Sequence, residues 1–238
     1  MSPCTESIAT VDLAITSRRS VRAFLPTPIP RRTVEDILEV ASRAPSGTNI
    51  QPWKVYVLGG EAKAALSRKI LDAYNDPATL AQHTDEVSSH PTEWVSPYID
   101  RRRKVGWDMY TLLDIAKGDS AEMHAQRGRN YEFFGAPVGL MFTIDRIMPR
   151  ASWLDYGMFL QSVMVAARAR GLHTCPQGAF LKFHRIVAEH IGAPAGETLV
   201  CGMSMGYEDV AAPVNALVSE RAPVAEFAKF IELPGQSR

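Results

Sequence analysis

Four residues near the N-terminus, Arg18, Arg19, Ser20 and Arg22, place three guanidinium groups and a hydroxyl close together along the chain. Arginine presents paired N–H donors that match the oxygens of a phosphate group, and a serine hydroxyl adds another contact. A cation beside an electron-rich ring also stabilises negative charge on that ring, and about 1.4 kcal/mol changes an equilibrium tenfold. The cluster therefore indicates a ligand with a phosphate and a ring. Read alone, it is equally typical of an exposed basic end of a helix.

A second polar cluster contains Pro45, Ser46, Gly47 and Asn49 and leads through Gln51, Pro52 and Trp53 toward a strand. Glycine lets the backbone approach a flat ligand closely, while serine and asparagine offer both donors and acceptors. The same residue types also build ordinary turns. The sequence from Gln51 to Trp53 is more specific than a turn requires, which favours a binding loop.

A third cluster comprises Pro176, Gln177 and Gly178, which follow Thr174 and Cys175. Gln177 and Gly178 would present backbone N–H donors to a bound ligand. Cys175 suggests a nucleophile, but it lacks a recognised Cys/His pattern. We therefore expect a structural thiol.

The last cluster is a strand with glycines at positions 202 and 206, followed later by Arg221. Glycine within a strand often marks the close approach of another group to the backbone. Arg221 alone would be interpreted as a surface residue. This cluster is informative only because it follows the other three clusters in the sequence.

Alternating apolar patterns predict the elements that position these clusters. We expect helices over residues 33–43, 61–74, 98–116 (bent near 106), 120–131 and 152–170, strands over residues 54–58, 137–145 and 198–205, and an irregular stretch over residues 75–97. Such alternation indicates an α/β or α+β protein in three layers, with the strand order left open. The helix 152–170 is apolar almost all round, so it lies either in the interior or in a large dimer interface.

Composition excludes several classes of protein. The 238 residues suit one hydrophobic core, and 26 basic against 26 acidic residues leave no broad basic field for nucleic acid or anionic membranes. No apolar run reaches the roughly 18 residues of a membrane span, and the first ten residues lack the layout of a secretory signal.

Three cysteines, Cys4, Cys175 and Cys201, suggest no disulfide framework and therefore a reducing cytoplasm. The spacing of the cysteines and histidines matches no usual zinc site, so we expect no metal.

Taken in order, the four clusters resemble the FMN-dependent nitroreductase family. The stretches 134–137 and 152–158 resemble the branch that contains nitrobenzoate reductases. The resemblance implies an α+β, three-layer α/β/α fold with a central, mostly antiparallel sheet, in an intertwined homodimer with FMN at the interface. It implies a single domain over residues 1–238, in which residues 75–104 cover the substrate pocket and residues 222–238 pack on the partner subunit.

The resemblance also implies roles for particular residues. Arg18, Ser20 and Arg221 would hold the FMN phosphate and ribityl chain with Arg19 beside them, and Arg22 would lie near the flavin pyrimidine. Gln177 and Gly178, next to Pro176, would lie against N5 and O4. Pro45, Ser46 and Asn49, with Gly47 between them, would reach the flavin of the opposite subunit. A basic residue often found in the family two positions before Arg221 is Ser219 here, so Arg18 would carry more of the phosphate contact.

The implied reaction is a ping-pong transfer from NADH or NADPH through the flavin N5 to a nitroaromatic or quinone acceptor, with no protein acid or base required. Trp94 and Tyr98 would stack on an aromatic substrate. The basic run from Arg101 to Lys104 would meet a carboxylate such as that of a nitrobenzoate, or it is simply a solvated helix face.

Two alternatives remain open at this stage. The same fold would serve reductive dehalogenation or other flavin chemistry. A protein of another class would bind the flavin for storage or sensing without turnover.

Overall fold

The computed structural model describes the backbone of residues 3–231 and the side chains from residue 10 onward. The strands are β1 (Lys54–Gly59), β2 (Val138–Asp145), β3 (His173–Gln177) and β4 (Glu197–Gly206). The α-helices are α1 (Pro3–Thr16), α2 (Arg31–Ala41), α3 (Gly60–Asn75), α4 (Pro77–Leu80), α5 (Tyr98–Leu112), α6 (Ser120–Gly128), α7 (Arg150–Arg168), α8 (His184–Ile191) and α9 (Val224–Phe227). Short 3-10 helices are η1 (Gly47–Asn49), η2 (Arg129–Gly135), η3 (Gly178–Phe183) and η4 (Pro213–Ala216).

The strands form one sheet in the order β1-β2-β4-β3, and each neighbouring pair is antiparallel. This confirms the prediction of a mostly antiparallel central sheet. Sequence reasoning missed β3, which is short and contains Pro176. Proline donates no hydrogen bond to a ladder, so it is tolerated at the edge position that β3 occupies.

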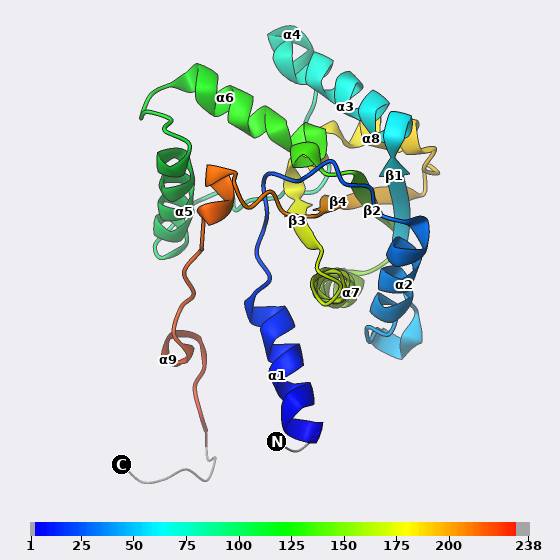
Figure 1. The fold of residues 1–238 in the computed structure, drawn as a ribbon. Coiled ribbons are helices and arrows are strands. Elements are labelled where there is room, and N and C mark those ends of the chain that lie inside the picture. The colour runs from blue at the N-terminus through cyan, green and yellow to red at the C-terminus, as the bar shows by residue number, and fades with distance from the viewer. Residues whose placement is uncertain (1–2, 232–238) are drawn as a thin grey trace.

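Two hydrophobic clusters cover the two faces of the sheet, as Figure 1 shows by the placement of α2 and α7 on one side and α3 and α8 on the other. Leu140, Phe142 and Ile144 of β2 point toward α2 and α7, while Met141 packs with α3. Alternation of this kind is what a strand buried on both faces requires. The three-layer α/β/α arrangement is therefore confirmed.

A β-bulge in β4 changes which face its side chains reach. Phe142 pairs with Cys201 and Thr143 pairs with Leu199, so Val200 is the extra residue. Leu199 belongs to the cluster under α3, whereas Cys201 belongs to the cluster under α7. Without the bulge, two residues this far apart would face the same side.

Gly202 and Gly206 allow aromatic rings to lie on the strand backbone. A Cβ at Gly202 would overlap the ring of Phe180, and one at Gly206 would come within 2.8 Å of the ring of Phe24. The close approach expected at these glycines is confirmed, and the groups that approach the backbone are aromatic side chains of the core.

Helix α7 is buried along one face only. Tyr156, Phe159 and Val163 are buried against the sheet, but Leu154 keeps 70% of its surface exposed. Within one chain, the expected interior helix therefore leaves an apolar face open to solvent.

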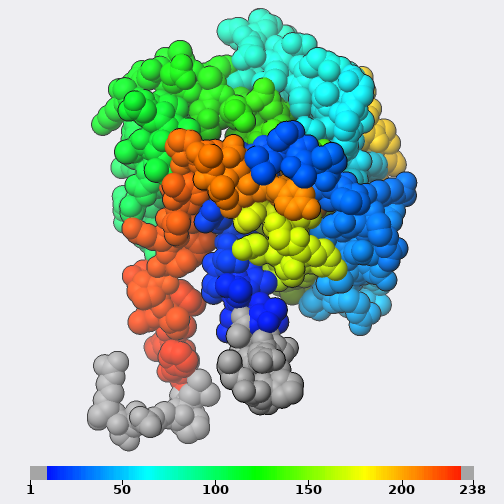
Figure 2. Space-filling model, viewed as in Figure 1, coloured from blue at the N-terminus to red at the C-terminus, as the bar shows by residue number. Residues whose placement is uncertain are grey.

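Helix α1 and the segment through α9 project from the body on the same side of the molecule (Figure 1), and the space-filling view shows them as separate arms (Figure 2). Part of the predicted C-terminal extension, residues 232–238, lies outside the described residues. The described part contacts its own chain, because Arg101 of α5 forms an ion pair with Glu226 of α9 at 3.1 Å.

Several boundaries differ from the sequence-based expectation. Helix α2 begins at Arg31 after Pro30, two residues before the expected start at residue 33, and it shows no side-chain cap. Helix α5 ends at Leu112. Among residues 3–231, no helix is both long enough and apolar enough to cross a membrane.

Candidate cofactor site

The basic cluster lies on an extended segment after α1. Helix α1 ends at Thr16, and the chain then runs beside β3, where Val21 N–H donates to the Thr174 carbonyl at 3.2 Å. Ser20 forms a parallel bridge to Thr174 as well. The simpler interpretation, an exposed helix end, is therefore wrong, because the segment is tied to the edge of the sheet.

Asn215 holds this segment from the other side. The Arg22 backbone N–H donates to the Asn215 Oδ1 at 2.8 Å, and Asn215 Nδ2 donates to the carbonyls of Ala23 and Asp209. Asn215 is only 4% exposed, and its three hydrogen bonds all join backbone groups. The Arg22 Nη1 group in turn donates to the Ser20 carbonyl at 3.3 Å.

Arg18 and Arg221 bring two like charges together. Burial lowers the pKa of Arg18, and the neighbouring charge of Arg221 lowers that pKa further. Arg221 Nη1 donates to the Ser219 carbonyl and hydroxyl and to the Glu220 carbonyl, at 2.7 to 2.9 Å. Among the described residues, Arg18 has neither an ion pair nor a hydrogen-bonding partner.

Both arginines line a cavity of about 760 Å³ between the end of α1, α7 and the segment after η4. Arg18 is partly buried whereas Arg221 is exposed, and a partly buried guanidinium group without counter-charge is costly unless an anion binds it. The residues present therefore fit a phosphate group.

Arg19 has a partner within the chain. Its guanidinium forms an ion pair with Glu208, whose second oxygen lies 3.3 Å from His173 Nε2. Burial is the largest effect on His173 and lowers the pKa of its imidazole. Arg19 Nε and His173 Nδ1 are buried and have no hydrogen-bond partner among the described residues. Arg19 thus lines the cavity, but the carboxylate of Glu208 neutralises its charge.

Cys175 lies beneath the basic segment. Burial raises the pKa of its thiol, and the nearby Arg22, Ser20 hydroxyl and Arg18 act in the opposite direction without overcoming it. A protonated, buried thiol is a poor nucleophile. The geometry supports the structural role expected for Cys175, and Cys201 is buried and free as well.

Gln177 ends β3 with its side chain fully engaged. Its Nε2 donates to the Asn130 carbonyl at 2.7 Å, and its Oε1 accepts from the Ser204 hydroxyl at 2.7 Å. Pro176 and Gly178 on either side are exposed. The side chain therefore anchors the strand end, which leaves backbone groups as the available donors.

The loop with Pro45, Ser46, Gly47 and Asn49 lies at the other edge of the sheet, just before β1. Gly47 N–H donates to Asp155 Oδ2 of α7 at 3.2 Å, and the Ser46 hydroxyl accepts from Gln51 N–H at 3.0 Å. Asn49 has a left-handed backbone, with φ of 60°, and its side chain is exposed. One chain does not bring this loop to the arginines.

The predicted cover, residues 75–104, passes next to Gly178, because a Cβ there would lie 4.0 Å from Ser89 Cβ. Trp94 carries the Arg102 guanidinium over its ring at 4.8 Å, and Tyr98 is 59% exposed. No described contact joins Trp94 or Tyr98 to the arginine cluster.

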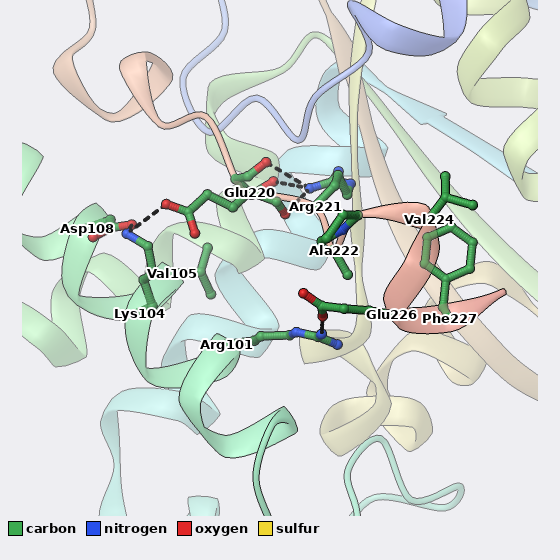
Figure 3. A pocket seen from close by; sticks show the side chains of 12 residues that line it. Arg101, Lys104, Val105, Asp108, Glu220, Arg221, Ala222, Val224, Glu226 and Phe227 are labelled. Carbon is green, nitrogen blue, oxygen red and sulfur yellow. Dashed lines mark hydrogen bonds and ion pairs between the residues drawn. The ribbon is translucent and has the colours of Figure 1, made fainter. Parts of the chain in front are cut away.

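Two of the four basic residues in the run on α5 form ion pairs with acidic residues. Arg101 pairs with Glu226, and Lys104 lies between Asp108 at 2.9 Å and Glu220 at 3.4 Å (Figure 3). These residues line a cavity of about 890 Å³ that Arg221 also borders. Arg102 and Arg103 have no acidic partner among the described side chains.

Sequence reasoning missed several residues that shape the site. The sequence gives one signal that could have identified Asn215 and Glu208. Each is a polar residue next to an apolar strand or an apolar stretch of the chain. The sequence gives no signal for Asp155 and Arg168 on α7, because charged residues along a helix are ordinary. Among the described residues, no three His, Cys, Asp or Glu side chains gather as metal ligands.

Comparison with known proteins connects this geometry to a family. The Nitroreductase family model matches residues 15–207. A 4-nitrobenzoate reductase of Pseudomonas putida is 44% identical over 92% of this chain and 95% of its own length. Another 4-nitrobenzoate reductase, from Nocardioides sp. (strain LMS-CY), is 39% identical over 94% of this chain and 91% of its own.

A solved structure agrees with the sequence matches. The FMN and NADPH-dependent nitroreductase NfnB from sphigopyxis sp. strain HMH superposes with a TM-score of 0.89 and 35% identity, over 94% of this chain and 99% of that one. The family match spans both the arginine segment and the strand end at Gln177. The chain therefore belongs to the nitroreductase family.

Proposed function

We propose that this protein is an FMN-dependent oxidoreductase that reduces nitroaromatic compounds, nitrobenzoates among them, with NADH or NADPH as electron donor. The relatives named above support the reaction and its cofactors. The observation that carries the proposal within this chain is the unneutralised pair formed by the partly buried Arg18 and the exposed Arg221 beside the beginning of β3. FMN, when bound, supplies two-electron chemistry that alternates between donor and acceptor.

The chain's own residues bind and orient. Arg18, Ser20 and Arg221 hold the phosphate and the sugar-alcohol chain, with Arg19 fixed beside them by Glu208. Arg22 supplies the cation near the pyrimidine ring, and Asn215 fixes its backbone. Gln177 and Gly178 offer backbone donors, with Pro176 alongside.

A homodimer completes the site in this proposal. Pro45, Ser46, Gly47 and Asn49 lie at the β1 edge, whereas the arginines lie at the β3 edge, so a second copy would bring the loop to the cofactor. The open apolar face of α7, with Leu154 70% exposed, and the projecting arms support such an assembly. Residues 222–231 would then contact the partner as well as their own α5.

Residues 75–104 are proposed to cover the substrate pocket, with Trp94 and Tyr98 stacking on the acceptor. The contact of Ser89 with Gly178 supports this placement. The cytoplasm is the proposed location, supported by the free thiols of Cys175 and Cys201.

The test is anaerobic titration of the purified protein. We expect a yellow protein whose visible flavin absorbance bleaches with NADH or NADPH and returns on addition of 4-nitrobenzoate. Absorbance that no nicotinamide bleaches would indicate a storage or sensor protein. Bleaching that halophenols reverse and nitroaromatics or quinones do not would indicate dehalogenation.

A further inference from the structure

Arg168 lines the same cavity as Arg18 and Arg221 but comes from a different element, the last turn of α7. Its Nε donates to the Ser17 hydroxyl at 3.0 Å, directly before Arg18 in the chain. This bond fixes the plane of the guanidinium. Neither terminal nitrogen of Arg168 has a partner among the described residues.

The charges around this cavity do not balance. Arg19 and Glu208 neutralise one another, and burial lowers the pKa of the neighbouring His173, which disfavours a positive charge on its imidazole. Among the described side chains, three guanidinium groups then remain without counter-charge: Arg18, Arg168 and Arg221. Three positive groups around one cavity match a phosphate monoester, which carries close to two negative charges at neutral pH.

We propose that Arg168 is a third phosphate-binding arginine, which reaches the FMN phosphate from α7 and is oriented by Ser17. This inference rests on the proposed function, because it assigns a residue to the cofactor of that same site. Since α7 also carries Asp155, which holds the loop at Gly47, one helix would contact the arginines of one cofactor site and the loop that reaches the other site of the dimer.

The experiment compares FMN with riboflavin, which has the same ring and side chain but no phosphate. Apoprotein from full-length wild type and from Arg168→Ala is titrated with each flavin, and the quenching of flavin fluorescence gives the dissociation constants. We expect Arg168→Ala to weaken FMN binding about tenfold and riboflavin binding less than twofold. The salt dependence of FMN binding should also decrease in this variant.

Matched variants separate a phosphate contact from a structural role. Arg170→Ala removes a neighbouring, exposed arginine whose Nη1 donates only to the Ala166 carbonyl, and it should leave both flavin affinities unchanged. Arg168→Lys should recover part of the FMN affinity, because it keeps the charge. Ser219→Lys in the Arg168→Ala background should do the same, since Ser219 lines the cavity and would return a positive charge to it.

Two results would overturn the proposal. Equal losses for FMN and riboflavin in Arg168→Ala would show a structural role. Unchanged FMN affinity combined with a higher KM for NADPH and an unchanged KM for NADH would assign Arg168 to the nicotinamide's phosphate instead. Failure of the wild type to bind FMN would contradict the proposed function itself, which keeps the two failures distinct.

Discussion

Two groups of charged residues in this molecule differ in whether other side chains of the chain bind and neutralise them. At the start of β4, Glu197 accepts hydrogen bonds from Lys54 at 3.0 Å, Tyr56 at 2.9 Å and Thr143 at 2.5 Å, so its carboxylate is fully partnered. Beside β3, Arg18 and Arg221 face one another without a counter-charge among the described residues.

The comparison distinguishes charged residues that stabilise the fold, such as Glu197, from charged residues that are available to bind a ligand, such as Arg18. Burial alone would raise the pKa of Glu197, but the hydrogen bonds from Thr143, Lys54 and Tyr56 outweigh burial and lower it. At Arg18, burial and Arg221 both lower the pKa, so the folded structure disfavours the positively charged form of this side chain. Arrangements that a chain does not compensate internally are typical of functional sites.

The largest effect is expected from Arg18→Ala. Losing a charged hydrogen-bond donor should weaken FMN binding by about 10- to 100-fold, measured as the dissociation constant of the flavin. Because the repulsion with Arg221 is relieved, the thermal stability of the apoprotein should not decrease. Arg185→Ala, at an exposed position of α8, is the control and should change neither quantity. A destabilised apoprotein would show that Arg18 belongs with the structural charges.

The opposite pattern is expected from Glu197→Gln. This change removes the negative charge and one of the two acceptor oxygens that Lys54, Tyr56 and Thr143 share, and it should lower the free energy of unfolding by about 1–3 kcal/mol. Urea denaturation of the apoprotein measures this quantity. FMN affinity should stay within twofold of wild type, and a larger loss would connect this network to the cofactor.

The stabilising effect of Glu197 should also depend on pH. Because the pKa of Glu197 is lowered in the folded protein from its ordinary value of 4.5, the carboxylate stabilises the fold above that value. The contribution is lost as the pH falls through the folded-state pKa. The difference in unfolding free energy between wild type and Glu197→Gln should therefore shrink below about pH 4.5. A constant difference down to pH 3 would contradict the assigned cause.

Arg22→Ala should separate binding from reactivity within the basic segment. Without a cation near the ring, reduction by the nicotinamide should slow about tenfold, while FMN binding weakens less than for Arg18→Ala. Stopped-flow absorbance under anaerobic conditions gives the reduction rate. Strong loss of FMN with an unchanged rate would reverse the assigned roles.

The smallest effect is expected at α5. Of its basic run, Arg101 and Lys104 are engaged by acidic residues, whereas Arg102 stacks on Trp94. Arg102→Gln should raise KM for 4-nitrobenzoate about threefold and leave KM for nitrobenzene unchanged, since only the first carries a carboxylate. Equal effects on both substrates would show that the basic run is a solvated face.

Local sequence predicted most of the elements, because their patterns are local. The apolar runs of β1, β2 and β4 and the periodicity of α3 and α7 came within a few residues of the structure. Strand β3 was missed, since Pro176 and the brevity of the strand hide it, and long-range pairing with β4 and with the segment at Ser20 and Val21 stabilises it. Helix α2 begins at Arg31, directly after Pro30, rather than at residue 33 as expected.

The sequence by itself determined the fold family and which arginines, glycines and polar loops are present, since residue types and their order are sufficient for that. The tertiary structure decided which charges the chain neutralises. Arg19 forms an ion pair with Glu208, about 190 positions away, and Arg168 donates a hydrogen bond to Ser17. Arg18 instead lies near another arginine, Arg221, which lowers its pKa. Pairing across such separations depends on how β3, β4 and α7 pack, and no local pattern records that packing.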